Sequence, residues 1–234
     1  MSDSLSGLQI VLAGGTGGLG SETAHLLARE EASLVVSYRG NVERASQSGV
    51  PGVVIQADLS SDADRARLLD ACPALYGLAV FAGQPARSEK LLEESMHANF
   101  VGPIRLAREA AERMKQRGTH GSIVLISTMQ TSAIFAHSTA YSAPKAALVH
   151  AAKILAKECR GPADIRVNVV SPGVNDAGMA QASIASGKYA PYLEGGAIPR
   201  YGRAADVARA VRFFLEPDNY ITGQVLTVDG GLTL

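Results

Sequence analysis

The segment Leu8–Gly20, LQIVLAGGTGGLG, predicts how this 234-residue chain folds. Leu8–Ala13 is an apolar run of the length of a buried strand, a glycine-rich turn follows at once, and Ser21–Glu31 has the pattern of a helix. Glycines allow a tight turn, bring bare backbone close to a pyrophosphate and let the helix pack closely on the strand. Because the N–H groups and the positive dipole end of that helix would face the phosphates, the segment predicts a dinucleotide-binding unit.

The rest of the chain continues this alternation of strands and helices. Strands are predicted at Leu8–Ala13, Leu34–Tyr38, Gly52–Gln56, Leu78–Ala82, Ser122–Ser127, Ile165–Ser171 and Val225–Val228. Helices are predicted at Ser21–Glu31, Arg65–Cys72, Met96–Arg117, from after the fifth strand through about Arg160, and at Asp206–Leu215. Short apolar strands between helices predict an α/β fold: one doubly wound (Rossmann) domain over residues 1–234, with a parallel sheet of about seven strands covered by helices on both faces. Such folds bind ligands outside the carboxyl ends of the strands.

Composition excludes several classes of function. Hydrophobic residues make up 47% of the chain, charged residues 19%, and the formal net charge is zero, so nothing points to nucleic acid. No apolar run approaches the roughly 20 residues that span a bilayer, and Met1–Gly7 lacks the features of a signal peptide. We therefore expect a cytoplasmic protein. Cys72 and Cys159 are expected to be reduced thiols, and the five histidines form no metal-binding pair.

The sharpest chemical signal is Tyr141-Ser142-Ala143-Pro144-Lys145. A spacing of four places Tyr141 and Lys145 on the same helix face. A free tyrosine has a pKa near 10, and a neighbouring ammonium is expected to lower it by stabilising the phenolate. Tyr141 is then placed to deliver a proton to a carbonyl oxygen as hydride arrives at the carbon.

This pair, together with glycines at 14, 18 and 20, resembles the short-chain dehydrogenase/reductase family, and especially its 3-oxoacyl-carrier-protein reductase-like branch. The resemblance covers essentially the whole chain. It implies a catalytic set of Asn99, Thr128, Tyr141 and Lys145. Thr128 stands thirteen residues before Tyr141, where serine is usual, and Ser127 is the alternative. Asn99 lies in a segment whose main chain would hold a water that links to Lys145.

The resemblance also implies a cofactor site drawn from five strand ends and the helix after the fifth strand. The residues concerned are Gly14, Thr16, Gly17, Gly18, Leu19, Gly20, Arg39, Asp58, Leu59, Ala82, Gly83, Tyr141, Lys145, Pro172, Gly173 and Val174. Asp58 and Leu59 would hold the adenine, although Asp58 is equally suited to a turn or helix cap. The Pro172–Val174 turn would lie under the nicotinamide.

The end of the second strand predicts the choice of nicotinamide cofactor. A preference for NAD usually requires an acid there, but the strand ends Ser37-Tyr38-Arg39. Arg39 matches the geometry of a ribose 2′-phosphate, so we expect NADPH rather than NADH. The alternative is an ordinary solvent-facing arginine.

Besides Thr128, the chain departs from the family pattern at four positions and in a shorter segment between Gly83 and Asn99. Ala13 replaces a threonine that braces the glycine turn, and Phe81 replaces an asparagine that braces the sheet. Ala177 replaces a threonine that often holds the carboxamide. Pro144 removes one backbone donor and is expected to loosen the first turn of its helix without breaking it. Gly178–Arg200 is expected to form the substrate lid, and its glycines at 187, 195 and 196 favour mobility.

The expected activity is NADPH-dependent reduction of a ketone to a secondary alcohol, with a 3-oxoacyl thioester on an acyl carrier protein as one candidate substrate. An acidic carrier would dock on a basic helix face, which is equally suited to plain solvation: Arg105, Arg108, Arg113, Lys115 and Arg117. The alternatives are a reductase of another small or polyketide-like ketone, and a catalytically silent NADP-binding regulator. By resemblance, the chain is expected to form a homodimer or homotetramer.

Overall fold

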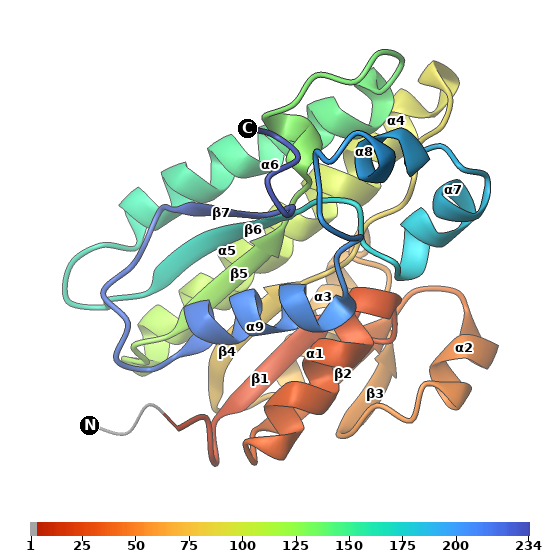
Figure 1. Cartoon of the computed structure of the whole chain (residues 1–234). Helices are drawn as coiled ribbons and strands as arrows, with labels where there is room; N and C mark the ends of the chain where they lie inside the picture. The colour runs from red at the N-terminus through yellow and green to blue at the C-terminus, as the bar shows by residue number, and fades with distance from the viewer. Residues whose placement is uncertain (1–3) are drawn as a thin grey trace.

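The computed structural model describes residues 4–234, which form one seven-stranded sheet in the order β3-β2-β1-β4-β5-β6-β7 (Figure 1). All neighbouring strands run parallel. The strands are β1 Gln9–Ala13, β2 Ser33–Tyr38, β3 Val53–Gln56, β4 Leu75–Val80, β5 Ser122–Ile126, β6 Arg166–Pro172 and β7 Val225–Val228. The predicted doubly wound α/β fold is confirmed.

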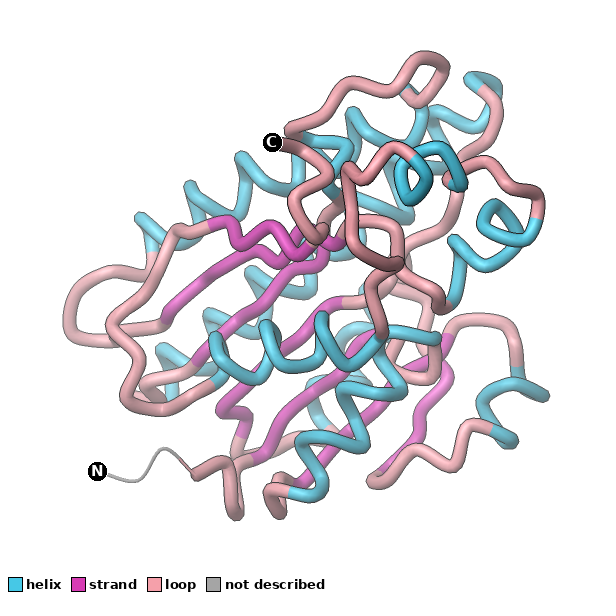
Figure 2. Tube along the Cα trace, in the orientation of Figure 1, coloured by secondary structure: helices cyan, strands magenta, loops and turns pink. Residues whose placement is uncertain are grey.

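Helices cover both faces of the sheet (Figures 1 and 2). One face packs against α1 Gly18–Arg29 and α9 Ala204–Leu215, and its buried cluster includes Leu27 and Val211. The other face packs against α3 Asp62–Asp70, α5 Gly102–Arg117 and α6 Thr139–Glu158. The central strands β4, β5 and β6 are buried on both sides, which is why their sequences are almost continuously apolar.

The long helix predicted over Met96–Arg117 is present, but it starts earlier and contains a π-helical turn. The chain forms α4 Leu92–Met96, a π-helical turn at His97–Val101 and then α5. A Cβ added at Gly102 would lie 3.0 Å from Cβ of Leu59, so this glycine lets the start of α5 pack on the turn after β3. The π-turn lies just before that contact, and such turns often mark functional positions.

Three other short helices were not predicted: α2 Val42–Gln47, α7 Gln181–Ala185 and α8 Ala190–Glu194. The helix predicted at Arg65–Cys72 starts earlier, at Asp62, because the Ser61 hydroxyl accepts from the backbone N–H of Asp64. Pro144 lies inside α6, which continues unbroken to Glu158 as expected.

Candidate active site

The predicted site residues gather at the carboxyl edge of the sheet. The glycine turn follows β1, Arg39 follows β2, and Asp58 and Leu59 follow β3. Ala82 and Gly83 follow β4, Thr128 follows β5, and Pro172–Val174 ends β6. Tyr141 and Lys145 come from the first two turns of α6, which begins on the same side of the sheet. Six strand ends and one helix therefore build one site.

The turn after β1 leaves no room for a side chain at Gly14 or at Gly20. Gly14 has φ +76°, and a Cβ there would lie 2.8 Å from the backbone N of Ala82. A Cβ on Gly20 would lie 2.7 Å from Cα of Gly15. Because Gly14 has no side chain, the turn can pack against the residues after β4. Because Gly20 has none, α1 can pack closely on β1, as the sequence predicts.

A serine on the neighbouring strand supplies the hydroxyl that supports the glycine turn, which Ala13 lacks. The backbone N–H of Gly14 donates to Oγ of Ser37, near the end of β2, at 3.2 Å. Ser37 is buried, so its hydroxyl is held in place beneath the turn. Sequence reasoning missed this residue because the brace comes from the neighbouring strand, 23 residues further along the chain.

The first turn of α1 fits an anionic group. The helix begins after Gly17 with no side-chain cap, and its first turn contains no acidic residue. Its leading N–H groups therefore remain available to phosphate oxygens. A Cβ on Gly18 would lie 2.6 Å from the backbone N of Gly178, so the lid segment begins directly beside this cradle.

Thr128, and not Ser127, lies on the side of Tyr141. Ser127 Oγ donates in the other direction, to the backbone carbonyl of Lys145 at 3.3 Å. The side chain of Thr128 lies close enough to the hydroxyl of Tyr141 to lower its pKa. Both Thr128 and Ser127 are buried, so this division of roles follows from the alternation of side chains at the end of β5.

The expected lowering of the Tyr141 pKa by Lys145 is wrong. Burial raises the pKa of Tyr141 to about 12; the side chain of Thr128 lowers it, and the nearby Tyr189 raises it further. Desolvation disfavours the phenolate more strongly than Thr128 favours it. Tyr141 therefore keeps its proton at neutral pH.

Lys145 is turned toward the sheet. Its Nζ donates to the backbone carbonyl of Ile126 at 2.9 Å, and the side chain is only 3% exposed. Burial lowers the pKa of Lys145 to about 8. A Cβ on Gly83 would lie 3.2 Å from Nζ of Lys145, so Gly83 leaves the space that the ammonium needs.

Asn99 is fully buried in the π-turn, and its side chain forms hydrogen bonds with the backbone of the segment after β4. Its Oδ1 accepts from the backbone N of Gln84 at 3.1 Å, and its Nδ2 donates to the backbone O of Gln84 at 3.0 Å. Nδ2 also donates to Oγ of Ser95 at 2.8 Å. Both the oxygen and the nitrogen of this buried amide therefore have hydrogen-bond partners, which offsets the unfavourable position of an asparagine inside a helix.

Two cofactor candidates are exposed at the strand ends. Arg39 donates from Nη2 to Oε1 of Gln84 at 2.9 Å. Asp58 accepts at Oδ1 from both the N–H and the hydroxyl of Ser60, so its carboxylate already serves the turn before α3. Leu59 is buried below that turn.

The segment predicted to be the lid packs on the carboxyl edge of the sheet through an aromatic cluster. Tyr189, between α7 and α8, is buried against Met129 and Val174, which adjoin Thr128 and the Pro172–Gly173 turn respectively. Tyr189 is close enough to Tyr141 to raise the pKa of its hydroxyl. This segment therefore places a second tyrosine near Tyr141.

Among residues 4–234, three buried side-chain oxygens lack a hydrogen-bond partner: Gln130 Oε1, Ser171 Oγ and Asn175 Oδ1. All three come from the segments that follow or end β5 and β6. Ser171 and Asn175 flank the Pro172–Val174 turn. Buried polar atoms without partners are rare in folded proteins, and functional sites are one place where they occur.

The basic helix face is largely neutralised by ion pairs. Arg108 pairs with Glu158 at 2.7 Å, Arg113 pairs with Asp70 at 2.6 Å, and Arg105 lies 3.9 Å from Asp62. These contacts favour the plain, solvated interpretation of that face.

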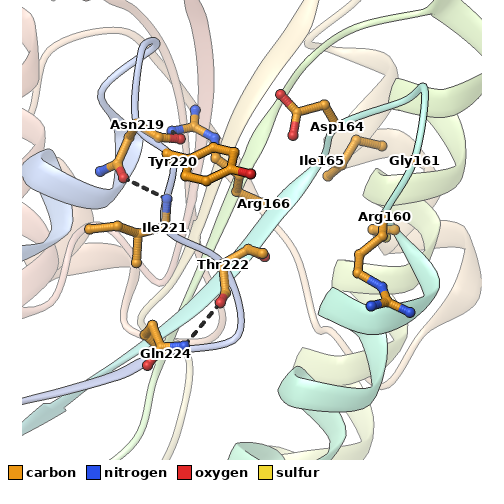
Figure 3. A pocket seen from close by; sticks show the side chains of 11 residues that line it. Arg160, Gly161, Asp164, Ile165, Arg166, Asn219, Tyr220, Ile221, Thr222 and Gln224 are labelled. Atoms are coloured by element: carbon orange, nitrogen blue, oxygen red, sulfur yellow. Dashed lines mark hydrogen bonds between the residues drawn. The ribbon is translucent and has the colours of Figure 1, made fainter.

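A cavity of about 520 Å³ lies at the amino ends of β6 and β7, between the loop after α6 and the segment after α9 (Figure 3). Arg166 in its wall is buried and donates to the carbonyls of Glu216 and Asn219 at 2.7 and 2.9 Å, which caps the end of α9. None of the predicted site residues lines this cavity.

The structure places further limits on the site within residues 4–234. No group of three or more His, Cys, Asp or Glu side chains in this range is arranged to hold a metal ion. The two thiols, Cys72 and Cys159, are free and buried. In the same range, no helix has both the length and the apolar character needed to cross a bilayer.

Known proteins similar to this chain agree in family. A family model described as enoyl-(acyl carrier protein) reductase matches residues 13–233. A 3-oxoacyl-[acyl-carrier-protein] reductase of Rattus norvegicus is 31% identical, over 94% of this chain and 96% of its own. The NADPH-dependent aldehyde reductase 2 of Arabidopsis thaliana is 29% identical, over 98% of this chain and 95% of its own.

A solved structure adds the same assignment. A short-chain type dehydrogenase/reductase from Mycobacterium ulcerans superposes with a TM-score of 0.88 at 26% identity, covering 98% of this chain and 91% of the other. The glycine turn, the Tyr141–Lys145 helix and the full-length match together show that the chain belongs to the short-chain dehydrogenase/reductase family of oxidoreductases.

Proposed function

We propose that the chain is a cytoplasmic, homo-oligomeric, NADPH-dependent reductase that converts a ketone to a secondary alcohol, with Tyr141 as the proton donor. The observation that carries this proposal is that the Thr128 side chain lies close enough to Tyr141 to act on the pKa of its hydroxyl, one helical turn before the buried Lys145. Asn99 in the π-turn would complete the catalytic set.

The residues present fit a dinucleotide. The uncapped α1 terminus and the glycines at 14, 18 and 20 suit the pyrophosphate, with Thr16, Gly17 and Leu19 completing the turn. Asp58, Leu59, Ala82 and Gly83 would border the adenosine. Pro172, Gly173 and Val174, beside the unpartnered oxygens of Ser171 and Asn175, suit the nicotinamide. Arg39 at the end of β2, with no acid at that strand end, favours NADPH, and an NADPH-dependent enzyme is among the relatives.

In this proposal the bound nicotinamide supplies hydride to the carbonyl carbon. The Tyr141 hydroxyl, protonated at neutral pH, gives its proton to the carbonyl oxygen, while the Thr128 hydroxyl stabilises the charge that develops there. Lys145, with a pKa of about 8, is suited to returning a proton to Tyr141. The aromatic lid around Tyr189 would exclude water.

For the substrate we propose a 3-oxoacyl thioester, since the relative from Rattus norvegicus reduces one on a carrier protein by name. The test is a panel of ketones, 3-oxoacyl thioesters and 2-enoyl thioesters, assayed with NADPH and NADH. We expect turnover of a carbonyl with NADPH, a loss of at least about 10²-fold in Tyr141→Phe, and a reversed cofactor preference in Arg39→Asp. Cofactor binding without turnover of any carbonyl would instead indicate a silent regulator.

A further inference from the structure

The guanidinium of Arg39 is held across the sheet edge. Arg39 follows β2, whereas its hydrogen-bond partner Gln84 follows β4, and β1 lies between these two strands. The 2.9 Å bond from Nη2 of Arg39 to Oε1 of Gln84 therefore spans the carboxyl end of β1, where the glycine turn begins. The backbone of Arg39 is fixed as well, because Nε2 of Gln56 donates to its carbonyl at 3.0 Å.

Gln84 is itself firmly anchored. Its backbone N and O are both bound by the side chain of the buried Asn99. Its side-chain Nε2 donates to Oε1 of Glu94 at 2.7 Å, which fixes the orientation of the amide and turns Oε1 toward Arg39. An exposed arginine is thus connected, through one glutamine, to the fully buried centre of the π-turn.

We propose that Gln84 is a positioning residue for cofactor choice: it holds the guanidinium of Arg39 at the end of β1 and leaves Nε and Nη1 to face a ribose 2′-phosphate. The inference rests on the proposed function, in which Arg39 selects NADPH. Gln84 lowers the entropic cost of binding, because a free arginine at an exposed strand end must give up its rotamers when it meets the phosphate. A neutral acceptor suits this role, since a carboxylate at position 84 would compete with the phosphate for the same cation.

Calorimetric titration of NADPH and of NADH, without substrate, tests the proposal. Gln84→Met keeps the length of the side chain but removes its acceptor and donor. We expect it to weaken NADPH binding about three- to tenfold and to change NADH binding less than about twofold. Gln84→Glu is expected to weaken NADPH binding further. Gln116→Met, an exposed glutamine on α5, is the matched control, and thermal unfolding checks that each variant is folded.

Arg39→Ala and the double variant Arg39→Ala/Gln84→Met complete the cycle. If Gln84 acts through Arg39, Gln84→Met has no further effect on NADPH binding once Arg39 is absent. The proposal is overturned if Gln84→Met strengthens NADPH binding, weakens both nucleotides equally, or still acts in the Arg39→Ala background. A separate result, an unchanged NADPH-to-NADH ratio in Arg39→Ala alone, would refute the role of Arg39 and with it the proposed cofactor choice.

Discussion

Replacing Lys145 with methionine is expected to change how the stability of the fold depends on pH. The ammonium is 3% exposed, and burial lowers its pKa from 10.5 to about 8. The native protein therefore releases this proton at a lower pH than the unfolded chain does. Between the two pKa values the unfolded state binds more protons, so the free energy of unfolding rises with pH. Below the native pKa, both states are protonated and the native state bears the full cost of a buried charge.

The size of this effect follows from the shift. Each pKa unit corresponds to about 1.4 kcal/mol, so the buried ammonium costs about 3 kcal/mol of stability at low pH. Of this cost, about 2 kcal/mol is relieved between about pH 7 and about pH 9.5. Lys145→Met removes the titration, and its stability relative to the parent should therefore be about 2 kcal/mol more favourable at the lower pH. The loss of the bond to the Ile126 carbonyl is the same at both pH values and cancels in this difference.

Urea unfolding at the two pH values, at one protein concentration, measures this difference. The chain contains no tryptophan, so far-UV circular dichroism is the suitable signal. Lys153→Met, at an exposed position on the same helix, is the control and should show the same difference from the parent at both pH values. If Lys145→Met also showed a pH-independent difference, the ammonium would not be titrating as a buried group, and its assignment as a proton relay would lose its basis.

Three further predictions concern the turn and the catalytic hydroxyl. Thr128→Ser should keep kcat within about threefold in the ketone assay, whereas Thr128→Val, which keeps the shape but not the hydroxyl, should lower kcat about 10²-fold; equal effects would show that the hydroxyl is not used. Gly14→Ala should lower the free energy of unfolding by about 1–3 kcal/mol because of its φ of +76° and its crowding, whereas Gly40→Ala, which has open space, should change it by less than about 0.5 kcal/mol in the same urea titration. Ser37→Ala should cost about 1–2 kcal/mol by leaving the Gly14 N–H without its acceptor, and adding Ala13→Thr should restore part of that loss; no rescue would mean that the two hydroxyls are not equivalent.

The central strands of the sheet were predictable because they are buried on both faces. A continuous apolar run such as Ser122–Ile126 leaves few alternatives, and the glycine turn fixed the position of the first strand. The short helices α7 and α8 could not be predicted in the same way. With five residues each, they are too short to show a period, and the aromatic cluster around Tyr189 supports them through contacts distant in sequence.

The site was predictable in its members but not in its electrostatics. Spacing correctly placed Tyr141 and Lys145 on one helix face, yet it could not show that Lys145 is buried or that desolvation would dominate the pKa of both groups. Burial moves their pKa values in the opposite direction from the one that pairing alone suggests. Asn99 was also only partly predictable. Its unfavourable position inside a helix is visible in the sequence, but the π-turn around it and its hydrogen bonds to the backbone of Gln84 are not.

The hydroxyl beneath the glycine turn has a consequence for how such chains diverge. Ser37 does from β2 what a threonine at position 13 would do from β1, so selection for a braced turn acts on the two positions jointly. Among homologous chains, alanine at the first position should occur together with serine or threonine at the second, and loss of both should be rare. A signature that demands threonine before the first glycine would overlook every lineage in which the brace has moved to the neighbouring strand.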